Sequence, residues 1–194
     1  MRVSREKFAE NRQKILETAG VMFRENGFNG VGVADIMKAC GLTHGGFYGH
    51  FESKEDLQLE VSRALITKVE IRWKELIAEA PDRPLEALLD YYVSWRAIDN
   101  PGSSCVFVAL MEEVSRSSGA VREIFNDGLS TLVDILAEIV PGDTPEERFK
   151  NGFTTLSSMM GAVSLARAVE NRELAGQFLS TMRKKLAPAK SADA

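Results

Sequence analysis

Apolar residues recur at intervals of three and four along most of the chain, which is the spacing of an amphipathic helix. The first such stripe includes Phe8, Ile15 and Phe23, and Gly27 follows it where glycine commonly ends a helix. No segment alternates β-branched and polar residues in the way that is typical of a strand. The pattern therefore predicts an all-α chain of about nine helices, without internal repeats.

Capping residues and turns divide the rest of the chain. The predicted helices span 33–40, 43–50, 53–80, 82–98, 105–116, 121–140, 144–169 and 172–186. Ser53 and Thr144 each stand three positions before an acidic residue, which is the spacing of a capping box. Pro145 then occupies the first helical position, where its missing N–H costs nothing. Residues 188–194 are predicted to fray.

Composition narrows the class of protein. The 194 residues are 44% hydrophobic and 27% charged, as in an ordinary soluble protein. No apolar run approaches the roughly 18 residues of a membrane-spanning helix, and the charged start lacks the apolar stretch of a secretion signal. The two cysteines, Cys40 and Cys105, lie far apart, which suits a reducing cytoplasm. We expect a cytoplasmic globular protein.

Charge is distributed unevenly along the chain. Residues 1–54 contain eight lysine and arginine residues against six acidic ones, a net charge of +2. The remainder contains 16 against 22, a net charge of −6. A basic N-terminal segment followed by an acidic remainder suggests that the N-terminal segment binds an anion, of which nucleic acid is the commonest. Chance scatter of charges is the alternative.

Two of the short predicted helices suit a helix-turn-helix. Residues 33–40 and 43–50 are joined at Gly41, and in this motif the second helix lies in the major groove. The surrounding residues are more specific than the spacing. They are Ile15–Phe28, Val33-Ala-Asp-Ile36 and Gly41-Leu-Thr-His-Gly-Gly-Phe-Tyr-Gly-His-Phe-Glu-Ser-Lys-Glu-Asp-Leu57. Through about residues 10–60 the chain resembles the TetR family of bacterial transcriptional regulators.

The resemblance implies a DNA-binding domain over residues 1–52 and a helical ligand-binding and dimerisation domain over residues 53–194. It implies a homodimer that binds palindromic operator DNA, most members being repressors that release DNA when an effector binds. The positions that it carries over as DNA-binding are Gly32, Thr43, His44, Gly45, Gly46, Tyr48, His50 and Lys54.

Physical reasons accompany several of these positions. Thr43 begins the second helix of the motif, where its hydroxyl can cap the helix and meet DNA. The phenol of Tyr48 is long enough to reach a phosphate, and Lys54 stands at a helix N-terminus, which favours anions. His44 and His50 can hydrogen-bond bases or phosphates in either protonation state. Phe47 and Phe51 are expected to pack inside the motif.

The sequence departs from the family pattern at its glycines. Gly32 stands where the family usually has a hydroxyl residue, so no side chain can meet a phosphate there. Gly45, Gly46 and Gly49 fall inside a predicted helix, and each costs roughly 1 kcal/mol relative to alanine. Either they let the backbone approach DNA closely, or packing tolerates them without a role.

The residues of an effector-binding site are harder to identify from the sequence. Trp95, Phe107 and Met111 are candidates for lining a cavity, with ordinary core as the alternative, and they favour an apolar ligand. Cys105 is expected in the first turn of a helix, which lowers a thiol pKa. Residues 102–114 resemble a segment from one branch of the family, in which some members sense electrophiles or oxidants through this cysteine. A small, buried, inert cysteine is the alternative.

Two helix faces are candidates for the dimer interface. Ser157, Gly161, Ser164 and Ala168 share one face, and a stripe of small residues lets another helix approach closely. Phe178 and Met182 repeat on the last helix. Together they suit an interface across a two-fold axis, with packing inside one chain as the alternative.

Other functions find little support. Both histidines belong to the motif, and no His/Cys pair has metal-ligand spacing, so we expect neither an enzyme nor a metal or cofactor. Glu112 and Glu113 are adjacent and therefore project in different directions from a helix. The remaining alternative is a helical protein-interaction module whose helix-turn-helix does not bind DNA.

Overall fold

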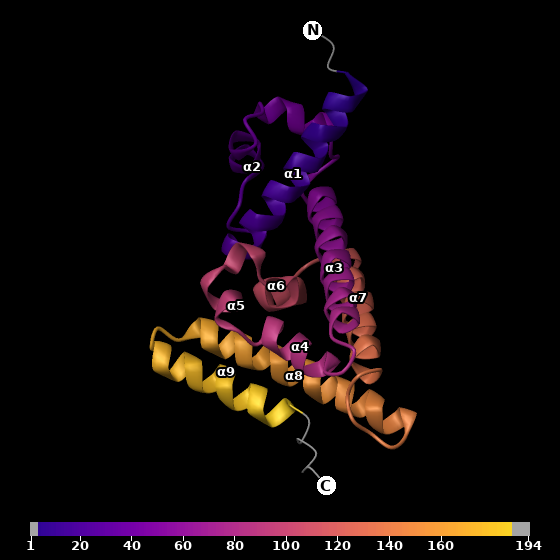
Figure 1. Cartoon of the computed structure of the whole chain (residues 1–194). Helices are drawn as coiled ribbons and strands as arrows, with labels where there is room; N and C mark the ends of the chain where they lie inside the picture. Colours follow the sequence, from indigo (N-terminus) through magenta and orange to yellow (C-terminus); the bar gives the residue numbers. More distant parts are fainter. Residues whose placement is uncertain (1–3, 188–194) are drawn as a thin grey trace. The chain divides into compact units, whose positions relative to one another are not determined.

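The computed structural model describes residues 4–187, and every regular element within them is helical (Figure 1). The elements are α1 (Arg5–Asn26), α2 (Val33–Ala39), η1 (His44–Gly49), α3 (Lys54–Glu79), α4 (Pro84–Tyr92), α5 (Trp95–Asp99), η2 (Pro101–Ser103), α6 (Val106–Ser115), α7 (Gly119–Ala137), α8 (Pro145–Ala168) and α9 (Arg172–Leu186), η marking 3-10 helices. The all-α prediction is confirmed for this part of the chain. The frayed end predicted for 188–194 lies outside it.

The ends of α1 form as their residue types favour. The hydroxyl of Ser4 accepts a hydrogen bond from the Lys7 amide at 3.1 Å, which satisfies one of the free donors of the first turn. At the other end Gly27 has φ +76°, a left-handed conformation that favours glycine, and its N–H donates to the Phe23 carbonyl at 2.8 Å. The predicted stop at Gly27 is therefore confirmed.

Both predicted capping residues also cap their helices. Ser53 Oγ accepts from the Asp56 amide at 3.0 Å, and Thr144 Oγ1 accepts from the Glu147 amide at 3.1 Å. The acidic side chain of each pair reaches one residue further back than the usual capping box, as the Asp56 carboxylate accepts from the Glu52 amide at 3.1 Å.

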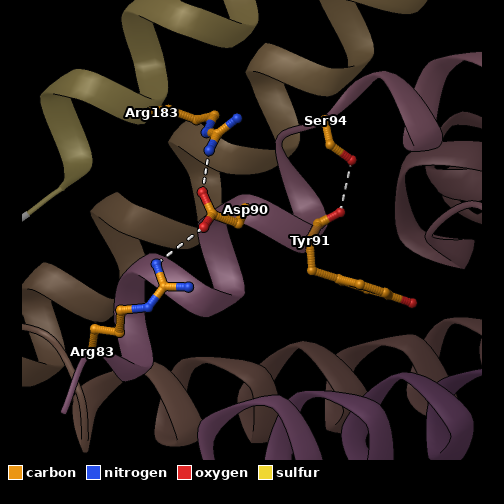
Figure 2. Close-up of polar contacts among 5 residues, drawn as sticks. All are labelled: Arg83, Asp90, Tyr91, Ser94 and Arg183. Atoms are coloured by element: carbon orange, nitrogen blue, oxygen red, sulfur yellow. Dashed lines mark hydrogen bonds and ion pairs between the residues drawn. The ribbon is translucent and has the colours of Figure 1, made fainter. Parts of the chain in front are cut away.

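The single helix predicted over 82–98 is wrong, because the chain breaks between α4 and α5. Val93, at φ −90° and ψ 69°, leaves the helical conformation, and its side chain is fully buried. Ser94 Oγ then donates to the Tyr91 carbonyl at 2.9 Å, taking an acceptor that a continuous helix would use for its own backbone (Figure 2).

The chain divides into two compact units, which are described separately. The first contains the chain up to Thr67 together with Pro101–Asn126, and its core includes Ile15, Phe23 and Phe47. In this unit α1 packs against α2, η2 and α6. The border falls inside α3, whereas the sequence predicted a functional border after residue 52, which stays a prediction.

The second unit contains Lys68–Asn100 and the chain from Asp127 onward. Here α8 packs along α9, and α4 packs against both. Trp73 and Tyr92 form part of its core, with their rings edge to face and the centroids 5.7 Å apart.

A shared carboxylate joins α4 to α9 in the second unit. Asp90 binds the guanidinium of Arg183 on α9 and that of Arg83, at 3.3 Å, at the start of α4 (Figure 2). These side chains are all substantially exposed, so the pairs add little stability. They connect α4 to α9, one of the helices predicted to form the dimer interface.

Candidate nucleic-acid interface

The helix-turn-helix begins at Gly32, in an extended conformation that caps α2. No hydroxyl is present there, as the sequence indicated, but the Asp35 carboxylate reaches back to accept from the Gly32 amide at 3.1 Å. At the far end, Gly41 has φ +68° and its amide donates to Lys38, while the Leu42 amide donates to Met37. This Schellman turn directs the chain out of α2 and into the second helix of the motif.

That second helix is tighter and shorter than predicted. It is the 3-10 helix η1 over His44–Gly49, with Gly46 N donating to Thr43 O and His50 N to Phe47 O, each three residues back. Glycine is a poor α-helix former, which accounts for the short 3-10 form. The prediction that the Thr43 hydroxyl caps this helix is wrong, because its side chain makes no capping hydrogen bond.

Two buried phenylalanines hold η1 in place within the unit. Phe47 is fully buried and lies 5.5 Å, centroid to centroid, from the buried Phe51. Cys40 is also buried, with its thiol 3.7 Å from the Lys14 carbonyl on α1. The packing roles predicted for Phe47 and Phe51 are confirmed.

The predicted DNA-contacting residues of η1 gather on its exposed surface. They are Thr43, His44, Gly45, Gly46 and Tyr48. Tyr48 is 64% exposed, although it is a large aromatic residue, and the His44 ring meets it edge to face at 6.1 Å. Lys54 is partly exposed at the first position of α3, where its ammonium is available to an anion. The arrangement presents hydroxyl, imidazole and ammonium groups on one motif.

His50 has a packing position that the sequence did not indicate. Its ring stacks on Phe8 of α1 with centroids 4.1 Å apart, and its Nδ1 is buried without a hydrogen-bond partner. Burial and, secondarily, the positive charge of Arg12 lower the pKa of His50 from its usual value. Its role toward DNA stays a prediction.

Some basic side chains of α1 are bound within the unit. Arg12 binds the Glu60 carboxylate of α3, and its guanidinium lies over the Phe51 ring, 4.8 Å from the centroid. Lys7 pairs with Glu10 at 2.9 Å on the surface. The basic segment over residues 1–54 is therefore partly neutralised by Glu10 within it and by Glu60 of α3.

Known proteins match both the motif and the fold. The sequence profile of bacterial regulatory proteins of the tetR family matches residues 15–61. The HTH-type transcriptional repressor DhaR of Mycobacterium sp. (strain GP1) is 26% identical over 188 residues, covering 92% of this chain and 93% of DhaR. The repressor KstR2 of Rhodococcus jostii is 34% identical over 90 residues, 45% of this chain and 43% of KstR2.

The crystal structure of E. coli NemR in its reduced form has a similar fold, with a TM-score of 0.78 at 22% identity. The match covers 95% of this chain and all of that one. Residues 15–61 therefore carry the helix-turn-helix region of the TetR family of bacterial transcriptional regulators.

One side chain that supports this motif from outside it could not be recognised from the sequence. The Glu113 carboxylate on α6 accepts hydrogen bonds from the amides of Phe28 and Asn29, the latter at 3.3 Å, in the turn between α1 and α2. It lies so close to Gly27 that a Cβ there would come within 2.6 Å of a carboxylate oxygen. Glu113 thus clamps the turn that leads into the helix-turn-helix. Nothing in the local sequence marks this contact.

The predicted effector-binding residues differ in burial and belong to different units. Phe107 is fully buried against Phe125, edge to face at 5.3 Å, while Met111 is 39% exposed; both belong to the first unit. Trp95 belongs to the second unit, where the guanidinium of Arg172 lies 4.2 Å from its ring centroid. Their roles toward an effector stay predictions.

Cys105 is a half-buried cysteine at the N-cap of α6. It therefore precedes the first turn of the helix, in which the sequence analysis had placed it. Its carbonyl begins the helical ladder by accepting from the Ala109 amide at 3.1 Å.

The predicted interface stripe of α8 faces outward. Ser157, Ser164 and Ala168 are exposed, and a Cβ at Gly161 would meet no atom within 4 Å. Large apolar side chains of α8 are exposed as well. They are Phe149 at 43%, Phe153 at 51% and Leu165 at 50%. Phe178 and Met182 of α9 are partly exposed. These residues thus remain accessible to a partner, and their role in a dimer stays a prediction.

Proposed function

We propose that this chain is a ligand-responsive repressor, which binds palindromic operator DNA as a homodimer and releases it when a small effector binds. The observation that carries the proposal is the exposed surface of η1, held on a buried phenylalanine within a helix-turn-helix. Its relatives DhaR and KstR2 are named transcriptional repressors, which favours this function over a protein-interaction module.

The side chains of the motif divide into two roles. Tyr48 and Lys54 bind phosphates, since a long phenol and an ammonium at a helix N-terminus suit an anion and carry no sequence information. Thr43 and His44, at the start of η1, reach base edges and contribute to sequence discrimination. Backbone amides near Gly32 replace the missing hydroxyl, since the Gly32 amide itself donates to the Asp35 carboxylate.

The exposed face of α8 pairs with its copy across a two-fold axis, together with α9. An exposed stripe of small residues flanked by large apolar ones is suited to close helix packing. Such a dimer places two copies of η1 in successive major grooves, with half-site centres about 34–36 Å apart.

The effector is a small apolar or electrophilic molecule, with Phe107 and Met111 of the first unit as its proposed binding residues and Cys105 as the reactive group if it is an electrophile. Sensing through Cys105 predicts that an α,β-unsaturated carbonyl compound releases DNA from the wild type and that Cys105→Ser resists release. Identical release curves for the two proteins would leave a noncovalent effector.

DNA binding is the direct test of the proposed function. Fluorescence anisotropy would compare a duplex from the region upstream of the chain's own coding sequence with a shuffled duplex of equal length. We expect tight binding to the first duplex and binding to the second that is weaker by about a thousandfold or more. Equal, weak binding to both duplexes would instead favour a protein-interaction module.

A further inference from the structure

Two glycines of η1 have no steric reason within the chain to be glycine. A Cβ built on Gly45 or Gly49 would meet no atom within 4 Å. Neither residue has the positive φ that disfavours other amino acids. Neighbouring glycines differ in this respect, since Gly41 has φ +68° and a Cβ on Gly46 would contact Thr43 and Met37. Alanine would therefore fit at positions 45 and 49 of the free protein.

Glycine at these positions also has an energetic cost. A glycine inside a helical segment destabilises it by roughly 1 kcal/mol relative to alanine, because the unfolded chain loses more freedom on folding. Both glycines lie on the surface of η1 beside Tyr48, which is 64% exposed. The destabilisation by Gly45 and Gly49 thus occurs on the surface proposed to bind DNA, where packing inside the chain does not require glycine.

We propose that Gly45 and Gly49 determine how closely the backbone of η1 approaches DNA, because the duplex occupies the space that a Cβ would fill. The inference rests on the proposed function and adds a specificity-determining role for two residues without side chains. A methyl group needs about 3.5–4.0 Å to its neighbours, whereas the donor and acceptor of a hydrogen bond lie about 2.7–3.2 Å apart. A methyl at either position would hold Tyr48 and His44 away from their partners on the duplex.

The close approach has a consequence for specificity. Because η1 offers only Thr43, His44 and Tyr48 as exposed side chains, few base edges can be read directly. A backbone lying against the groove is sensitive to groove width and deformability instead. We therefore expect operator discrimination to depend strongly on DNA shape.

The experiment compares Gly45→Ala, Gly49→Ala and Gly119→Ala with the wild-type protein. Gly119, at the start of α7, is a matched control because its Cβ also would meet nothing within 4 Å, and it lies outside the helix-turn-helix. Thermal unfolding is followed by circular dichroism. DNA affinity is measured by anisotropy on a duplex that the wild type has selected from a random-sequence library.

We expect Gly45→Ala and Gly49→Ala to unfold at or above the wild-type temperature and yet to bind the selected duplex at least tenfold more weakly. Gly119→Ala should bind as the wild type does. Wild-type affinity in both η1 variants would overturn the inference, and so would a lowered unfolding temperature, because the space around these positions would then not be free. If the wild type selects no duplex, the proposed function itself fails.

Discussion

At the scale of single residues, we propose different roles for the side chains on η1 and at the start of α3. Their variants should therefore differ in how they bind operator and random DNA. Thr43 and His44 stand at the start of η1, whereas Tyr48 and Lys54 follow further along the motif. A group that binds phosphate contributes to affinity for every sequence. A group that binds a base edge contributes only to the correct one.

Tyr48→Phe and Lys54→Ala should therefore weaken binding to operator and random DNA alike. Lys54→Ala should also reduce the slope of log affinity against log salt by about one, because one fewer counterion is released. Thr43→Ala and His44→Ala should instead change the ranking of operator variants. Anisotropy titrations at several salt concentrations measure both effects. A changed ranking with unchanged overall affinity for Lys54→Ala would remove it from the phosphate-binding residues.

His50 should make the stability of the chain depend on pH. Its lowered pKa means that the folded chain binds a proton less readily than the unfolded chain. Its contribution is therefore full above its ordinary pKa of about 6.5 and is lost as the pH falls through the lowered value. Burial of the ring and, secondarily, the positive charge of Arg12 disfavour the charged form.

His50→Phe keeps a ring against Phe8 and removes the titration. Urea unfolding at intervals between about pH 5 and pH 8 should show the wild type losing more stability toward low pH than the variant does. Parallel stability curves for the two proteins would contradict this origin of the pH dependence.

At the scale of elements, most helix boundaries follow from signals within one turn of chain. The caps at Ser53 and Thr144 and the stop at Gly27 form as the residue types indicate, since each hydrogen bond joins residues three or four apart. The break at Val93 escaped prediction, because Pro84–Asp99 carries neither glycine nor an internal proline to mark it. Burial of the Val93 side chain accompanies the break.

The clamp between α6 and the turn before α2 can be tested by removing its carboxylate. Glu113→Ala leaves the amides of Phe28 and Asn29 without this acceptor, and water replaces it only in part because Glu113 is half-buried. We expect a loss of about 1–2 kcal/mol in the free energy of unfolding.

Glu112→Ala is the matched control for that measurement. Glu112 is exposed and pairs with Arg116 one turn along the same helix, at 3.1 Å. Its removal should cost at most a few tenths of a kcal/mol. Equal losses in the two variants, measured by urea unfolding, would show that the Glu113 contact does not stabilise the turn.

At the scale of the whole molecule, the exposed face of α8 predicts a dimer that a single charge disrupts. Leu165 is 50% exposed beside Ser164 and one turn from Gly161 and Ala168. Leu165→Arg would place a guanidinium in a closely packed, two-fold interface, where it meets its own copy. We expect a dimer for the wild type and a monomer for the variant by sedimentation at micromolar concentration.

Ile71→Arg is the control for the dimer prediction, because Ile71 of α3 is 52% exposed and thus matches Leu165 in accessibility. It should remain dimeric. A monomeric wild type would count against the interface, and so would a Leu165→Arg variant that sediments as the wild type does.

The amino-acid sequence by itself determined the helical class, most helix bounds, and the motif by which the family is known. Hydrophobic periodicity, capping residues and terminating glycines act over three to seven residues, so they can be recognised in the sequence without knowledge of the fold. The exposed candidate DNA-binding residues of η1 could also be identified from the sequence, because a buried Phe47 leaves the neighbouring side chains facing solvent.

Only the tertiary structure decided the contacts between distant segments. Glu113 binds an amide 85 residues away, and His50 stacks on Phe8 of another helix. It also decided that the small-residue stripe of α8 faces outward and that positions 45 and 49 have room for a side chain. Such facts depend on how elements pack, which residue types constrain only weakly, because one amphipathic pattern is compatible with many partners.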